Sequence, residues 1–80
     1  MIEKDIINAT HSKILQKIVT LRSNADVSQV ELADAIGISE SGYFKVEKGK
    51  TKLDLERLLI ILLKLKISPK DFFKDIELNF

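Results

Sequence analysis

Four lysines lie close together near the middle of the chain, and their chemistry is that of phosphate binding. Residues 41–52 hold these four lysines and one acid, Glu47, so the segment has a net charge of +3, whereas the whole chain has a net charge of only +1. The lysines are Lys45, Lys48, Lys50 and Lys52. The last three alternate with other residues, a spacing that lets a loop follow the phosphates of a nucleic-acid backbone. A basic loop can also be merely solvated, so its meaning depends on the element before it.

Two other patterns suggest catalysis but lack essential residues. Gly49-Lys50-Thr51 matches the end of a phosphate-binding P-loop, but Phe44 stands where that loop needs a glycine. Residues 37–41 match most of a nucleophile elbow, but Ser41 replaces its last glycine and His11 is the only histidine. We expect His11 to be a surface or interface residue rather than a pH sensor.

The acidic residues near the C-terminal end favour a solvated patch over a metal site. They are Asp71, Asp75 and Glu77. The sequence therefore predicts no enzyme, no metal, no cofactor and no small-molecule ligand.

Length and composition narrow the class of protein further. The chain has 80 residues, no cysteine and 45% hydrophobic residues, which indicates one small folded domain (residues 1–80) in a reducing cytoplasm. The first residues do not resemble a signal peptide. The longest apolar run, residues 58–63, is far short of the ~20 residues that span a bilayer, so no membrane partner is expected.

Apolar periodicity and capping residues predict three helices in the first half of the chain. A first helix is expected over residues 10–24, and Ile7 and His11 fall on the same apolar stripe, which allows an earlier start. A second starts at Ser28, where Glu31 completes a capping box, and it ends before Gly37. The third is expected over residues 39–48, burying Tyr43 and Val46, and it ends before Gly49.

Two more helices complete an all-α, five-helix fold, with no strand. The fourth starts at Asp54 and should form the centre of the core through Leu55, Leu58, Leu59, Ile61, Leu62 and Leu65. The fifth opens with Ser68 as cap and Pro69 at the first helical position. The second and third helices, joined by a tight turn with glycine at its start, have the signature of a helix-turn-helix.

The sequence from residue 21 to residue 69 resembles the Cro/C1-type helix-turn-helix family, also called the xenobiotic response element regulators, with its lambda repressor-like fold. The matching stretches are Leu21-Arg22, Val27-Ser28-Gln29, Glu31-Leu32-Ala33, Ile36-Gly37-Ile38-Ser39, Glu47-Lys48-Gly49-Lys50, Leu58, Leu65 and Ile67-Ser68-Pro69. The resemblance spans about three fifths of the chain without a gap. The resemblance implies a DNA-binding core over residues 10–67 and double-stranded DNA as partner.

The resemblance also implies roles for individual residues. Gln29 corresponds to a glutamine that holds a phosphate and braces the recognition helix, and Arg22 and Glu47 match a structural ion pair. The recognition helix is residues 39–48, entering the major groove by its N-terminal end. The base-reading positions are Glu40, Ser41, Phe44 and Lys45. The phosphate-binding positions beside Gln29 are Lys48, Lys50, Thr51 and Lys52.

Three residues depart from what relatives usually carry on this helix. Glu40 can accept a hydrogen bond from a cytosine amino group, but it would repel a nearby phosphate. Gly42 is expected to remove a side chain from the base-reading face and to weaken the helix by up to ~1 kcal/mol relative to alanine. Phe44 can contact a thymine methyl group, or it can mark a protein-binding surface instead.

Surplus apolar residues near the C-terminal end predict a homodimer. Residues 68–80 form a C-terminal helix and tail, and a domain of this size has too little interior for all of their apolar side chains. Phe72 is expected to cap the core. The expected interface residues are Ile60, Leu63, Phe73, Ile76, Leu78 and Phe80. A two-fold dimer would place two recognition helices one DNA turn apart on a pseudo-palindromic operator.

These features together predict a homodimeric transcriptional regulator, a repressor or an autoregulatory switch. The layout is similar to that of restriction–modification controller proteins and of antitoxins with this fold. We expect a cytoplasmic, nucleoid-associated protein of a prokaryote or phage. The alternative is a degenerate helix-turn-helix that serves as a protein-interaction adaptor or antitoxin, with Tyr43, Phe44 and the phenylalanine-rich tail as its contacts.

Overall fold

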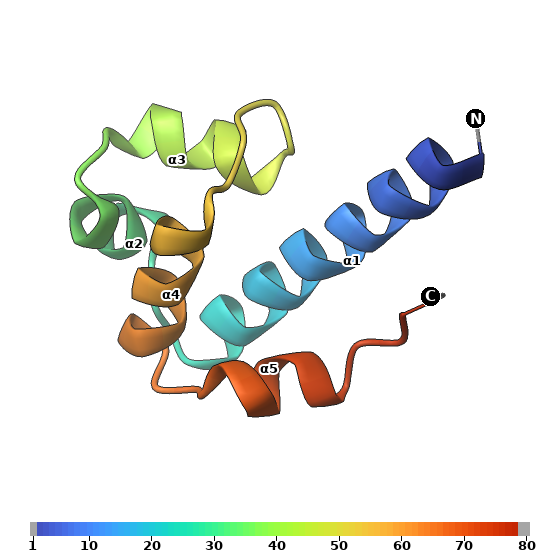
Figure 1. The fold of residues 1–80 in the computed structure, drawn as a ribbon. Helices are drawn as coiled ribbons and strands as arrows, with labels where there is room; N and C mark the ends of the chain where they lie inside the picture. The colour runs from blue at the N-terminus through green and yellow to red at the C-terminus, as the bar shows by residue number, and fades with distance from the viewer. Residues whose placement is uncertain (1, 79–80) are drawn as a thin grey trace.

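Five α-helices form the regular structure of residues 2–78, the part of the chain that the computed structural model describes (Figure 1). They are α1 (Ile2–Asn24), α2 (Gln29–Ile36), α3 (Glu40–Glu47), α4 (Leu55–Lys64) and α5 (Pro69–Lys74). No strand occurs within this range, so the expected all-α, five-helix fold is confirmed. None of the helices described here is long and apolar enough to cross a membrane.

Helix α1 begins at Ile2, eight residues before the position that apolar periodicity favoured. It contains neither glycine nor proline, and Glu3 and Asp5 in its first turn interact favourably with the positive end of the helix dipole. Its N-terminal half extends past the other helices, and the segment after α5 returns beside it (Figure 1). The helix ends in a turn where Asp26 has a left-handed backbone with φ of 56°, as its residue type allows.

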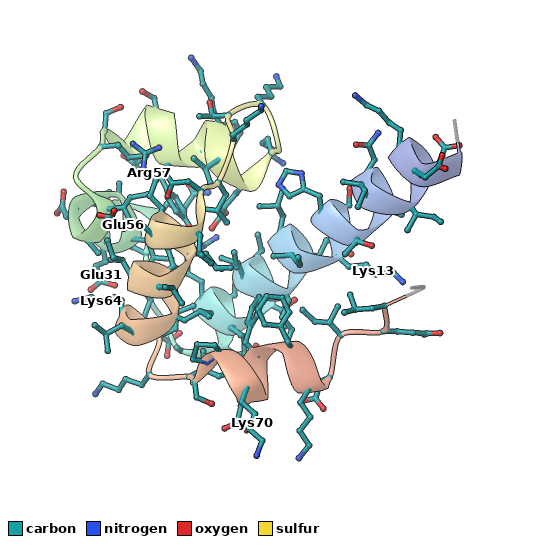
Figure 2. The ribbon with its side chains drawn as sticks, in the orientation of Figure 1. Lys13, Glu31, Glu56, Arg57, Lys64 and Lys70 are labelled. Carbon is teal, nitrogen blue, oxygen red and sulfur yellow. The ribbon has the colours of Figure 1, made fainter. Side chains whose placement is uncertain are left out.

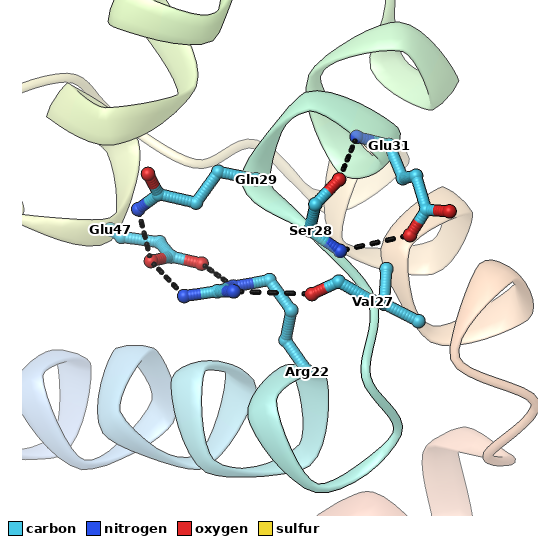
Figure 3. Close-up of polar contacts among 6 residues, drawn as sticks. All are labelled: Arg22, Val27, Ser28, Gln29, Glu31 and Glu47. Atoms are coloured by element: carbon cyan, nitrogen blue, oxygen red, sulfur yellow. Dashed lines mark hydrogen bonds and ion pairs between the residues drawn. The ribbon is translucent and has the colours of Figure 1, made fainter.

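Side-chain caps fix where α2 and α3 begin. The Ser28 hydroxyl accepts from the Glu31 backbone N–H at 3.1 Å, and the Glu31 carboxylate accepts from the Ser28 N–H at 2.8 Å, which forms the predicted capping box (Figure 3). Gly37 ends α2 with φ of 77°, a conformation that strongly favours glycine. Ser39 then caps α3 by accepting from the Gly42 N–H at 3.0 Å. The turn between the two helices is therefore locally determined.

The hydrophobic core lies where α2 and α4 pack together, with α1, α3 and α5 around them. Tyr43 and Phe72 are the largest of its fully buried side chains. The core cluster consists of Ile18, Leu32, Ala33, Tyr43, Leu58, Ile61, Leu62 and Phe72. Phe72 thus brings α5 onto the core, and its ring packs edge-to-face on Phe73 at 5.0 Å between centroids.

Two leucines that we expected in the core on α4 are exposed instead. Leu55 is 71% exposed and Leu59 is 45% exposed. The apolar side of α4 is wider than its neighbours can cover, so periodicity alone does not say which of its apolar residues are buried. In the structure the buried side holds Leu58, Ile61 and Leu62, while Leu55 and Leu59 share an open side with Leu63.

Candidate nucleic-acid interface

Helix α3 is held by its inner face and presents its outer face to solvent. Tyr43 and Val46 are fully buried and anchor the helix against α1 and α2. The four residues expected to read bases are exposed on the outside: Glu40, Ser41, Phe44 and Lys45. Ser41 Oγ lies 3.3 Å from Ser39 Oγ, so its hydroxyl can bond the capping residue until another partner replaces it.

Gly42 does not belong to that outer face, which corrects our expectation. It is half-buried, and a Cβ atom there would lie 3.1 Å from Ser39 Oγ and 3.6 Å from Ile38 Cδ1. The position is turned toward the cap at the start of α3. Glycine leaves room for the Ser39 hydroxyl at this point, so its use here is steric.

Phe44 is 46% exposed, and part of its ring is covered by a lysine of the same helix end. Lys48 Nζ lies 5.3 Å from the ring centroid, within the range of a cation–π contact. This contact holds an apolar group and a positive charge together at the C-terminal end of the base-reading face.

The segment after α3 folds back on the helix, which keeps its lysines beside the base-reading face. The backbone N–H groups of Lys50 and Thr51 both donate to the Lys45 carbonyl, at 2.9 and 3.3 Å. Gly49 makes this possible with φ of 76°. The predicted phosphate-binding residues of this segment are all exposed: Lys48, Lys50, Thr51 and Lys52.

A polar network ties α1, α2 and α3 together behind the base-reading face (Figure 3). Arg22 donates from Nε to Glu47 Oε2 at 2.7 Å and from Nη2 to Glu47 Oε1 at 3.2 Å. Its Nη1 donates to the Val27 carbonyl at 3.1 Å. Gln29 Nε2 donates to Glu47 Oε1 at 2.9 Å. One carboxylate on α3 therefore receives donors from α1 and α2.

The surroundings of Glu47 hold it in the charged form. Burial alone raises the pKa of its carboxyl, but hydrogen bonds from Arg22 and Gln29 outweigh burial and bring the pKa below its ordinary value. Burial, together with the nearby Glu47 carboxylate, raises the pKa of Tyr43 far above its ordinary value. Within residues 2–78 the Tyr43 hydroxyl has no partner at full hydrogen-bonding geometry, so its contact with Glu47 is a loose one.

The amino-acid sequence of residues 18–72, more than half of the chain, matches the model of a helix-turn-helix family. The chain belongs to the Cro/C1-type helix-turn-helix family. It is similar to an uncharacterized HTH-type transcriptional regulator, y4wC, of Sinorhizobium fredii, with 35% identity over 68 residues. The alignment covers 85% of this chain but only 48% of the relative, so the chain spans about half the length of that protein. No solved structure matches the chain.

The helix-turn-helix segment places Gln29 where it can serve two groups. Its amide nitrogen has two N–H groups, and one of them is used by Glu47. The other is available to a further acceptor. Gln29 is half-buried at the first position of α2, beside the exposed N-terminal turn of that helix. This geometry is compatible with the phosphate role that the family resemblance implies.

The residues of this helix-turn-helix domain that we expected at a dimer interface differ in their exposure to solvent. Leu63 is 79% exposed, and Phe73 and Leu78 are exposed as well. Ile60 is half-buried, and Ile76 packs partly against the core. Phe80 lies outside the described residues.

Among the described residues, no cluster of acidic residues or histidine could hold a metal ion, and this includes the acidic residues near the C-terminal end.

The structure of the helix-turn-helix protein confirms one expectation about Tyr43 and corrects another. Tyr43 is fully buried, as expected from its place on the third helix, so it cannot also serve as a surface contact of an adaptor; of that predicted pair only Phe44 is exposed. A polar groove also lies between α1 and the end of α3, with His11 in its wall. The long polar face of α1 was the available signal, but its neighbour could not be read from the sequence.

Proposed function

We propose that this protein is a homodimeric, sequence-specific double-stranded DNA-binding transcriptional regulator, a repressor or autoregulatory switch. The observation that carries the proposal is the outer face of α3. Glu40, Ser41, Phe44 and Lys45 are all exposed there, and the lysine-rich segment continues the same surface. A helix of this width fits the major groove, and the flanking lysines reach phosphates.

The network behind α3 supports this role by making the surface rigid. Arg22, Gln29 and Glu47 join three helices through charge-assisted hydrogen bonds. Base-reading side chains that are held in place before binding lose less conformational entropy when they meet DNA. The fold is therefore suited to present one fixed set of contacts to a base sequence.

An open apolar surface on α4 supports dimerisation. A groove of about 430 Å³ lies between α4 and the start of α5, lined mainly by Leu59, Leu63, Ile67 and Pro69. Because Leu63 in its wall is 79% exposed, the groove gives this side of the domain an apolar surface that a second copy can cover. A two-fold pair would read a pseudo-palindromic operator, and binding would rise with protein concentration because dimers bind better than monomers.

The direct test is selection of bound sites from a random DNA pool, followed by affinity measurements on the selected site. A dimer that neutralises ~6–10 phosphates loses about 10³–10⁵-fold in affinity between ~50 and ~200 mM salt. The variant Lys45→Ala, Lys50→Ala should bind more weakly and show a shallower salt dependence. The matched control is Lys70→Ala, Lys74→Ala, because Lys70 lies on α5, far from α3 (Figure 2).

An absence of DNA binding at low salt would sink the proposal, as would equal binding by the two lysine variants. In that case the protein-interaction adaptor or antitoxin becomes the better function. Phe44 on α3 and, at a separate place on the domain, Phe73 and Leu78 of the C-terminal segment are exposed apolar residues that favour that second candidate. Its expected signature is a protein complex that Phe44→Ala weakens.

A further inference from the structure

The groove between α1 and the end of α3 is built largely of polar groups. It has a volume of about 400 Å³. Helix α1 contributes Asn8, His11, Ser12 and Gln16, and the end of α3 contributes Lys48 and Gly49. Leu15 forms an apolar part of the wall. Glu47 also lines the groove, but the charge of its carboxylate is balanced by Arg22 at 2.7 Å.

The donors of this groove are not used elsewhere in the described part of the chain. Within residues 2–78, no hydrogen bond or ion pair engages the side chains of Asn8, His11, Ser12, Gln16 or Lys48. Lys48 makes only its contact with the Phe44 ring. An amide, an imidazole, a hydroxyl and an ammonium group can all donate to an anionic oxygen. The groove therefore offers several open donors to an anion.

The groove is continuous with the surface already assigned to DNA. Lys48 and Gly49 belong both to its wall and to the lysine-rich segment after α3. Its other wall comes from the part of α1 that precedes residue 18, where the family match begins. Lys4 stands one turn before Asn8 on the same helical face, and Asp5 lies toward the edge of that face. The early part of α1 thus adds a second wall beside the recognition helix.

We propose that this groove binds phosphates of the DNA backbone that flank the bases contacted by α3. The inference rests on the proposed function and deepens it, since it adds α1 to the DNA-binding surface. Lys48 supplies the charge, and Asn8, His11 and Ser12 supply neutral donors to the phosphate oxygens. The protein consequently covers more backbone than residues 18–72 do alone.

A pair of charge-adding variants tests the position of the phosphate. His11→Lys places a new charge in the groove, whereas Thr20→Lys places one on an exposed site half a turn around the same helix. The slope of log affinity against log salt should steepen by about 0.9 per protomer for His11→Lys and stay unchanged for Thr20→Lys. Ser12→Lys, at an exposed position of the groove, provides a second variant if His11→Lys folds poorly. Equal slopes in the groove variants and the control would overturn the inference.

His11 also gives a readout that needs no variant, because it is the only histidine in the chain. Its imidazole NMR signals should shift when a DNA duplex carrying the selected site is added at low salt. DNA binding with unmoved His11 signals would overturn the groove assignment and leave the proposed function standing. An equal shift with inorganic phosphate at the same concentration would show a free-anion site and also overturn it. A wild-type protein that binds no DNA would overturn both proposals.

Discussion

Arg22 Nε and Glu47 Oε2 lie 2.7 Å apart, and this contact joins the end of α1 to the end of α3 across 25 residues of sequence. Both side chains are almost entirely buried, so water solvates their charges poorly. Each charge is therefore stabilised mainly by the other. The carboxylate also receives Gln29 from the first turn of α2. This ion pair and its hydrogen bonds therefore fix the position of the recognition helix together with the buried Tyr43 and Val46.

Loss of the acid should destabilise the fold strongly. Glu47→Ala leaves the Arg22 guanidinium without its partner, and removing one member of a buried pair costs about 3–5 kcal/mol. We expect a loss near 3 kcal/mol in the free energy of unfolding, measured by urea denaturation. Glu40→Ala, at an exposed position on the same helix, should change it by less than ~0.5 kcal/mol. Similar losses in the two variants would contradict the structural role of the pair.

The same carboxylate should make stability depend on acid pH. Its pKa is lower in the folded protein than the ordinary value of 4.5, so the unfolded chain binds more protons between the two values. The stabilisation by Glu47 is then complete above about pH 4.5 and is lost as the pH falls through the folded-state pKa. Glu47→Gln removes this group, so its stability should fall less steeply over that window in urea titrations. Parallel curves for the two proteins would refute the shift.

The Tyr43 hydroxyl should contribute little to stability or even oppose it. It is buried with only a loose contact to Glu47, and an unsatisfied buried polar group costs about 1–3 kcal/mol. We expect Tyr43→Phe to be neutral or up to ~1 kcal/mol more stable in thermal or urea unfolding. Tyr43→Ala is the packing control, with an expected loss of about 3–5 kcal/mol. A loss above ~1 kcal/mol in Tyr43→Phe would mean that the hydroxyl makes a strong hydrogen bond.

The proposed dimer can be broken at a residue that the monomer does not need. Leu63 is 79% exposed, so Leu63→Asp should keep the helical circular dichroism signal while the mass from light scattering falls to that of a monomer. DNA affinity should fall with it, because one recognition helix is lost from each complex. Ile7→Asp, 56% exposed on α1 and outside the predicted interface, should remain a dimer. A wild-type mass already equal to one chain would remove the dimer from the proposal.

Local interactions explain why so much of the fold is predictable from the sequence. The caps at Ser28, Ser39 and Ser68 each bond a backbone group three residues away, so residue types alone specify where those helices begin. Gly37 and Gly49 mark helix ends for the same reason, since a positive φ strongly favours glycine. The resemblance to relatives then indicated the recognition helix and the residues on its face.

The sequence did not predict the contacts between segments that are distant in the chain. The apolar side of α4 is wider than its neighbours can cover, so Leu55 and Leu59 look like core residues until the packing of α2 and α5 shows which part is covered. Helical periodicity identifies a face, but only the packing partners decide whether the face is buried.

The sequence by itself determined the five helices, the helix-turn-helix and the lysine-rich segment that follows it, because these depend on caps, periodicity and local charge. Only the tertiary structure decided that Leu55 and Leu59 are exposed and that His11 lies across a groove from Lys48. The last relation joins residues 37 positions apart in the chain. No local rule relates them, since the angle at which α1 crosses α3 is set by packing in the core.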